Sequence, residues 1–194
     1  MSAAPPERIR LDDGITLRWF TVDDAEAIAR AVGESLEHLR PWMPWANAQS
    51  TDVEFQRNRL HNQPQQRQRG EEWQYGIFAS EPGGALLGSI GLMTRRGPGT
   101  LEIGYWLQVD AGGRGVATNA ARALTDIGVH MPDIDRMIIT CDEANVRSAA
   151  IPPRLGYTLE RVEQRQPEAP GESGRLQLWV LRTRTGGTTT PTTP

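Results

Sequence analysis

A strand, a glycine-rich turn and a helix follow one another without interruption between Leu101 and Leu124. Residues 101–109 are mostly aromatic or aliphatic, which predicts a strand buried on both faces. The turn holds Gly112, Gly113 and Gly115, and glycine lets a backbone approach a ligand closely. Apolar residues then recur at helical spacing, at Ala117, Ala120, Ala121, Leu124 and Ile127. Because the first amides of a helix have no partner within it, this segment predicts an anion-binding site.

Two common glycine-loop motifs do not match this turn. A P-loop ends in Gly-Lys-Ser/Thr, and the chain contains no lysine. A dinucleotide fingerprint that starts at Gly113 needs glycine or alanine where Thr118 stands, and no acidic residue closes a following strand at the usual distance. The anion is therefore expected to belong to another class of ligand.

The residues around the turn resemble a known family. Glu102, Gly104, Tyr105, Trp106 and Leu107 precede a Gly-Arg-Gly-Val-Ala-Thr run at 113–118, and this pattern resembles the pyrophosphate loop of the GNAT acyltransferases, in particular their RimJ/RimL branch. Farther along, Asn145-Val-Arg-Ser148 leads to Leu155-Gly-Tyr157, similar to the second motif of that family. The chain departs from the family at Gly112, where Arg or Gln is common. Backbone amides and Arg114 are therefore expected to contact the phosphates.

The resemblance, which extends from about Ile15 to Arg182, implies an α/β (α+β) architecture, the GNAT fold. Its mixed central sheet has about six to seven strands flanked by helices, and two central parallel strands splay apart to admit the pantetheine arm. We expect a single domain over 13–184, a flexible lead over 1–12 and a disordered Thr/Pro tail over 185–194. Strands are predicted at 15–20, 73–79, 86–93, 101–109, 137–141, 157–162 and 176–182. Helices are predicted after Thr21, from Thr51 through Leu60 with an exposed Gln- and Arg-rich stretch behind it, and from Thr118.

Composition narrows the remaining possibilities. With 194 residues and 38% hydrophobic residues, one core is expected, and no apolar run approaches the roughly 20 residues of a membrane span. The first residues lack the pattern of a signal peptide and the single cysteine cannot form an internal disulfide, which together favour the cytoplasm. The net charge of −3 argues against nucleic acid as a partner, although all 21 basic residues are arginine. The sequence leaves open whether the chain forms a homodimer.

The resemblance implies an acyl-CoA-dependent N-acyltransferase. By default it moves acetyl from acetyl-CoA to a primary amine, such as the N-terminal α-amino group of a protein, by direct attack in a ternary complex that needs no metal. A small-molecule amine as acceptor, succinyl as the acyl group, and a non-catalytic acyl-CoA binding or sensing module are the alternatives. Such chemistry needs a group that takes a proton from the amine, donors for the developing oxyanion, and a proton for the thiolate.

Glu102 is the first choice for the base, because it lies on the strand that should flank the thioester. The alternative is a carboxylate bonded to a neighbouring strand or to an arginine, with Glu71 and Glu72 in reserve. Pro152 stands where many family members have the tyrosine acid, so Ser148 is the candidate partner of the sulfur. Asn145 is expected to bond the pantetheine amides as well as to cap a helix.

Donor binding is assigned to edge amides and to the glycine turn, at Leu107, Gln108, Val109, Gly112, Gly113, Arg114, Gly115, Val116, Ala117 and Thr118, together with Asn145. Trp42, Trp45 and Tyr105 are candidates for the wall of the acceptor pocket. The three histidines lack metal-ligand spacing, so no metal site is expected. Cys141 is expected to be a buried, inert thiol.

Overall fold

The computed structural model describes residues 4–11, 14–79 and 84–183. Its strands are β1 (Arg8–Arg10), β2 (Ile15–Trp19), β3 (Glu72–Ala79), β4 (Leu86–Met93), β5 (Thr100–Leu107), β6 (Arg136–Asp142), β7 (Thr158–Gln164) and β8 (Arg175–Arg182). Its α-helices are α1 (Ala25–Glu34), α2 (Leu36–Leu39), α3 (Val53–Gln68), α4 (Val116–Gly128), α5 (Val146–Ala149) and α6 (Ile151–Arg154). Short 3-10 turns lie at Val22–Asp24, Ala48–Thr51 and Val109–Ala111.

The strands form one mixed sheet in the order β1-β2-β3-β4-β5-β6-β8-β7. Every neighbouring pair is antiparallel except β5 and β6, as the crossover through α4 predicts. The sheet has eight strands in the described part of the chain, more than the six to seven expected. The additional strand is β1, which pairs with β2 and lies within the segment expected to be a flexible lead.

The predicted splay between the parallel strands is confirmed. Backbone pairing of β5 with β6 ends where Ile103 faces Ile139, although β5 continues to Leu107 and β6 to Asp142. Over the remaining residues the two strands have no register with each other, while β5 keeps its pairing with β4 as far as Leu107. The sheet therefore opens at its centre without losing its outer strands.

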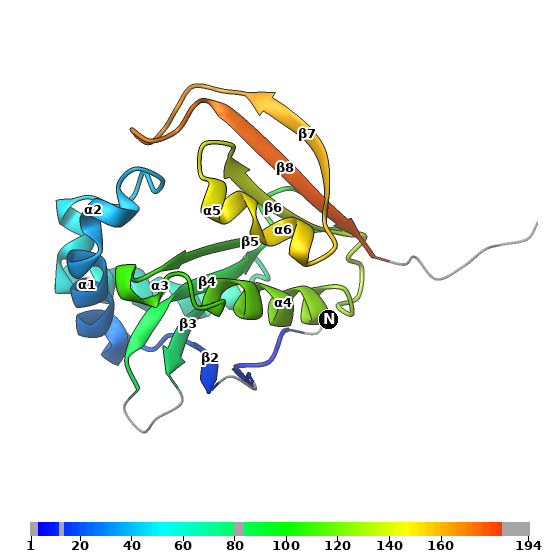
Figure 1. Cartoon of the computed structure of the whole chain (residues 1–194). Coiled ribbons are helices and arrows are strands. Elements are labelled where there is room, and N and C mark those ends of the chain that lie inside the picture. The colour runs from blue at the N-terminus through cyan, green and yellow to red at the C-terminus, as the bar shows by residue number, and fades with distance from the viewer. Residues whose placement is uncertain (1–3, 12–13, 80–83, 184–194) are drawn as a thin grey trace, which may run out of the picture.

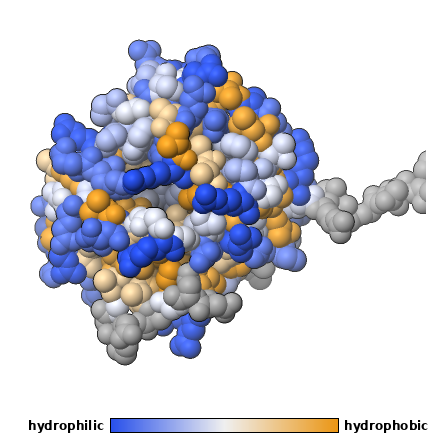
Figure 2. All heavy atoms as spheres, in the orientation of Figure 1, coloured by the Kyte–Doolittle hydropathy of each residue, from blue (hydrophilic) through white to orange (hydrophobic). Residues whose placement is uncertain are grey.

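Helices cover both faces of the sheet, and α4 crosses one of them (Figure 1). The main core lies between that face and α4, whose Ala120, Ala121 and Leu124 are fully buried. A smaller core, centred on Phe20, Ile28 and Phe78, joins the other face to α1 and α3. The outer surface in the same orientation is mainly hydrophilic, with small apolar patches (Figure 2). No helix in the described ranges is both long and apolar enough to cross a membrane.

Helix α3 differs from the prediction at both ends. It begins after Asp52, whose Oδ1 accepts a 2.7 Å hydrogen bond from the amide of Phe55, so the cap is one residue later than Thr51. It continues through Pro64 to Gln68. Tertiary contacts explain the continuation: Gln63 is buried, and the guanidinium of Arg67 stacks 4.6 Å from the ring centre of Trp19.

Other predicted segments match closely. β3, β4 and β5 form the expected antiparallel meander, and the Pro- and Trp-rich stretch at 36–45 contains only the short helix α2. Most of the expected turn at Glu81–Gly84, part of the expected lead and the expected tail over 185–194 lie outside the described residues.

Candidate active site

The glycine turn leads directly into the N-terminus of α4, as predicted. Gly113 and Gly115 have φ angles of +77° and +80°, in the left-handed region that strains other residues. A Cβ built at either position meets no heavy atom within 4 Å. Glycine is thus required here by backbone conformation, and open space lies in front of the amides. This turn fits a pyrophosphate bound at the start of a helix.

A donor cavity of about 880 Å³ extends from this turn to α5 and α6. Most of the residues predicted to bind the donor line it, namely Leu107, Val109, Gly112, Gly113, Gly115, Val116, Ala117, Thr118 and Asn145. Gln108 and Arg114 do not: their side chains bond Glu34 Oε2 at 2.7 Å and the Asp110 carbonyl at 3.0 Å. Arg147 and Arg154 line the cavity instead. Arg147 lies in α5 and Arg154 in α6, and the sequence assigned neither of them to the donor although both lie within the second motif.

Backbone amides at the splay are the expected donors for the thioester carbonyl. The amide of Gln108 donates to the Leu87 carbonyl at 2.8 Å, toward β4. Because successive amides of a strand point to opposite edges, the amide of Leu107 faces the gap beside β6. The amide of Val109 instead donates to Ser35 Oγ at 3.1 Å. Of the two expected donors, only Leu107 therefore offers an amide directed to the gap.

An acceptor cavity of about 780 Å³ lies on the other side of this gap. Trp42 and Trp45 both line it, and Trp45 packs against Trp106 with their ring centres 5.8 Å apart. Residues that line both the donor and the acceptor cavity are Trp42, Met43, Tyr105, Asn145 and Ser148. A thioester reaching through the splay would meet an acceptor amine at these residues.

Tyr105 and Ser148 are in contact at this meeting point. The Tyr105 Oη lies 3.2 Å from Ser148 Oγ, and Asn145 caps α5 by accepting a 3.2 Å hydrogen bond from the Ser148 amide. Burial raises the pKa of Tyr105 above its ordinary value of 10.0, and the hydrogen bond with Ser148 opposes that rise only in part. The phenol is therefore a neutral hydrogen-bond donor over the whole physiological range.

Glu102 has contacts that make it a poor base. Its side chain is 1% exposed and accepts hydrogen bonds of 2.9 Å from Arg95, Arg96 and Thr140. Burial alone would raise the pKa of Glu102, but the hydrogen bonds and positive charges of the two arginines outweigh it and lower the pKa to about 2. These contacts favour the alternative interpretation, a structural carboxylate. The same contacts show that Arg95 and Arg96, in the turn before β5, are both salt-bridge partners of Glu102.

Glu72 is differently placed. It lines the acceptor cavity and has no arginine or histidine within 4 Å among the described residues; its carboxylate accepts a hydrogen bond from the Gln74 amide group. Gln74 in turn accepts a 3.1 Å hydrogen bond from Ser89 Oγ, so a short relay orients the carboxylate. Glu71, the other reserve candidate, is exposed and paired with Arg69 at 2.7 Å. Of the two reserves, Glu72 is the one that faces the acceptor.

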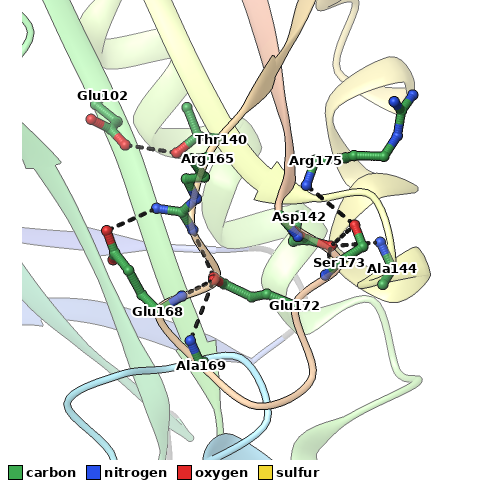
Figure 3. Close-up of polar contacts among 11 residues, drawn as sticks. Glu102, Thr140, Asp142, Ala144, Arg165, Glu168, Ala169, Glu172, Ser173 and Arg175 are labelled. Atoms are coloured by element: carbon green, nitrogen blue, oxygen red, sulfur yellow. Dashed lines mark hydrogen bonds and ion pairs between the residues drawn. The ribbon is translucent and has the colours of Figure 1, made fainter.

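The loop between β7 and β8 contributes Arg165, Glu168 and Glu172 to the lining of the acceptor cavity, and Figure 3 shows its polar contacts. Asp142, at the end of β6, accepts hydrogen bonds of 2.8–3.0 Å from Ala144, Ser173 and Gly174. Within the loop, Glu172 pairs with Arg165 at 2.7 Å. The sequence predicted strands at 157–162 and 176–182 on either side of this loop, but indicated no part for the loop in the site.

The loop also reaches across to the segment after α2. The amide of Gly171 donates to the Pro41 carbonyl at 2.8 Å. A Cβ at Gly171 would lie 2.7 Å from that same carbonyl oxygen, so the close approach requires glycine. This contact bridges the acceptor cavity.

Two further sequence expectations concern Cys141 and metals. Burial raises the pKa of the Cys141 thiol to about 11, so it stays protonated. Within the described ranges, no three His, Cys, Asp or Glu side chains are grouped so that they could hold a metal ion.

Comparisons with known proteins agree with this geometry. The profile of the family described as "Acetyltransferase (GNAT) domain" matches residues 15–158. "Putative ribosomal N-acetyltransferase YdaF" of Bacillus subtilis is 25% identical over 156 residues, 78% of this chain and 81% of that protein.

Solved structures share the fold. The ribosomal-protein-S5-alanine acetyltransferase of Vibrio fischeri has a TM-score of 0.82 at 18% identity, covering 91% of this chain and 97% of its own. The microcin C7 self-immunity acetyltransferase MccE, in complex with acetyl-CoA and AMP, has a TM-score of 0.80 at 23% identity, with the same two coverages.

Proposed function

Because the chain belongs to the GNAT acetyltransferase family and uses acetyl-CoA as donor, we propose that its acceptor is the N-terminal α-amino group of a protein. The single observation that carries this proposal is the meeting of two cavities at Tyr105 and Ser148, one with a glycine turn and one with a carboxylate, Glu72, that forms no salt bridge among the described residues. YdaF is named a putative ribosomal N-acetyltransferase and the Vibrio fischeri enzyme a ribosomal-protein-S5-alanine acetyltransferase, and these names support a protein acceptor. Acetyl-CoA as donor supports a cytoplasmic location.

Charge in the acceptor cavity supports a cationic acceptor. The cavity is lined by four arginines and five carboxylates, which leaves one negative charge in excess. We propose that Glu72 attracts the ammonium group and takes its proton, directly or through a water molecule, before the amine attacks. Glu102 then serves to hold Arg95 and Arg96 in the wall of the cavity.

The donor side would stabilise the reacting atoms. The Leu107 amide, directed to the gap, is proposed to donate to the thioester carbonyl as negative charge develops there. Tyr105 and Ser148 are proposed to donate hydrogen bonds to the departing sulfur. The amides of the glycine turn would hold the pyrophosphate, and Asn145 the pantetheine.

A small-molecule amine is the second candidate acceptor. The contact of Gly171 with Pro41 favours it, because this contact joins the β7–β8 loop to the segment at 42–45, both of which line the acceptor cavity, and so limits the room for the end of a folded protein. A flexible N-terminus could still enter as an extended chain.

Thiol release from acetyl-CoA tests both candidates and the non-catalytic alternative. The acceptors are short peptides with a free N-terminus, the same peptides blocked by N-formylation, and a set of small primary amines. Transfer to the free peptides alone would support the proposal, and transfer to small amines alone would replace it with the second candidate. Absence of transfer despite acetyl-CoA binding would support a binding module, and succinyl-CoA in the same assay would test the other acyl group.

A further inference from the structure

Arg59 differs from the other arginines of the acceptor cavity. Arg95 and Arg96 pair with Glu102, and Arg165 pairs with Glu168 and Glu172. Among the described residues, Arg59 has no carboxylate within 4 Å, although it lines the same cavity. It is a cation that faces the acceptor without a partner of opposite charge.

The guanidinium of Arg59 is nevertheless held in place. Its Nε donates to Gln56 Oε1 at 3.0 Å, and Gln56 is buried, with its Nε2 donating to the Ser50 carbonyl at 2.6 Å. Gln56 is thereby oriented with its oxygen toward Arg59. The two terminal nitrogens of Arg59 are left for a ligand, in the fork geometry that suits a carboxylate.

Arg59 and Glu72 are close enough to interact. Burial lowers the pKa of Arg59, and the charge of Glu72 opposes this in part, yet the two groups form no ion pair. The side chain is accessible to solvent although it lies in a concave part of the surface. The acceptor cavity therefore presents one unpaired anion and one unpaired cation side by side.

We propose that Arg59 binds a carboxylate of the acceptor beside the amine that Glu72 receives, so that the preferred acceptor is a protein with an acidic side chain within its first two residues. This inference rests on the proposed function, which it narrows from any N-terminus to an acidic one. A basic second residue would bring a like charge to Arg59 and would be disfavoured.

The test uses matched acceptors. Peptides that begin Ser-Asp, Ser-Asn and Ser-Lys and are otherwise identical are compared by kcat/KM with the full-length enzyme. For the parent we expect kcat/KM to fall in the order Ser-Asp, Ser-Asn, Ser-Lys. The value for Ser-Asp should exceed that for Ser-Asn roughly tenfold, as one charge-assisted hydrogen bond would give. Arg59→Gln should remove the advantage of Asp through KM and leave the Asn peptide unchanged, while Arg59→Glu should favour Lys.

The control is Arg57→Gln, two residues earlier on α3, where the arginine pairs with Glu54 on the outer side of the helix. It should keep the parental order. Calorimetric binding of CoA should be the same for all variants, which separates a change in specificity from a loss of folding.

A small-molecule pair distinguishes this inference from the proposed function. Glutamate and glutamine differ in a side-chain carboxylate and are assayed alongside the peptides. A preference for glutamate that Arg59→Gln removes, without transfer to any peptide, would support the role of Arg59 and overturn the N-terminal acceptor. Peptide transfer with the same order in parent and Arg59→Gln would overturn the role of Arg59 and keep the proposed function.

Discussion

The donor cavity and the acceptor cavity are formed by different kinds of structural feature. The donor cavity uses glycine conformation, backbone amides and a helix N-terminus from the segments at 107–118 and 144–154, and residues at 38–43 together with Tyr105 complete its lining. The acceptor cavity uses charged and aromatic side chains from α3, β3, β5, the 42–45 segment and the β7–β8 loop. A backbone site is insensitive to most side-chain substitutions and suits a donor that never varies. A side-chain site can change its acceptor by single substitutions.

The charged groups of the acceptor cavity differ in whether they are available to act on a substrate. In the acceptor cavity, most charged groups are bonded to each other or to backbone amides, as Glu102 is to Arg95 and Arg96. Such groups shape the wall but are not available for proton transfer. Glu72 and Arg59 are the exceptions among the described lining residues, so the comparison predicts that they affect the acceptor and not the donor.

The largest effect is expected from Gly115→Glu, which places bulk and a negative charge where backbone should meet phosphates. Its φ of +80° adds backbone strain. Affinity for acetyl-CoA, measured by calorimetry, should fall about 1,000-fold, or about 4 kcal/mol. Gly14→Glu is the control, because Gly14 has a φ of +73° and equally open surroundings but lies far from the cleft in sequence and fold. Unchanged affinity in folded Gly115→Glu would remove the turn from donor binding.

Glu102→Gln should act on stability rather than on catalysis. A pKa lowered from 4.5 to about 2 corresponds to about 3 kcal/mol of stabilisation at neutral pH. Because the folded pKa is the lower one, this contribution is complete above the unfolded pKa and disappears as pH falls through about 2. Urea unfolding should therefore show a deficit of about 3 kcal/mol at pH 7 that shrinks progressively below pH 4.5.

The control for that experiment is Glu163→Gln, a half-buried surface partner of Arg161 whose loss should cost at most about 0.5 kcal/mol. Activity per folded molecule of Glu102→Gln should stay near that of the parent. A drop of about 100-fold in folded enzyme, partly restored at high pH, would reinstate Glu102 as the base.

Glu72→Gln should lower kcat/KM for the acceptor by about 100-fold and leave donor affinity unchanged, because an amide cannot take a proton. Raising the pH should partly restore the rate by supplying free amine. The adjacent Glu71→Gln removes an exposed carboxylate that pairs with Arg69, and it should match the parent. If both variants are equally active, Glu72 has no part in proton transfer.

The smallest effect is expected from Ser148→Ala, which removes one hydrogen bond at the point where the cavities meet. Turnover should fall about fivefold to tenfold, with donor affinity unchanged. Tyr105→Phe should have a similar effect, and the double variant should lose less than the two losses combined, because the hydroxyl groups are 3.2 Å apart. Additive losses would show that the two groups act separately.

The fold and the donor cavity could be predicted because their determinants are local. The glycines, the helix after them and the asparagine cap act within a few residues, so their spacing carries their structural role. The strand–helix–strand crossover through α4 likewise indicated the parallel pair and its position. Donor binding by Gln108 and Arg114 stays a prediction, and in the structure their side chains bond Glu34 and the backbone of Asp110.

The sequence by itself thus determined the acetyltransferase fold and the glycine turn that leads into α4, because backbone conformation and helix geometry follow from neighbouring residues. Only the tertiary structure showed how each carboxylate is held. Glu102 and Glu72 both lie on strands, and although Arg95 and Arg96 precede Glu102 by only seven and six residues, that spacing does not show that both guanidinium groups turn onto its carboxylate. The turn that carries Arg95 and Arg96 folds back onto Glu102, whereas Glu72 faces open space beside Arg59. The low pKa of Glu102 depends on the fold of this turn, and Thr140 on the neighbouring strand β6 adds a hydrogen bond to the same carboxylate, so these contacts exist only once the sheet and its turns are assembled.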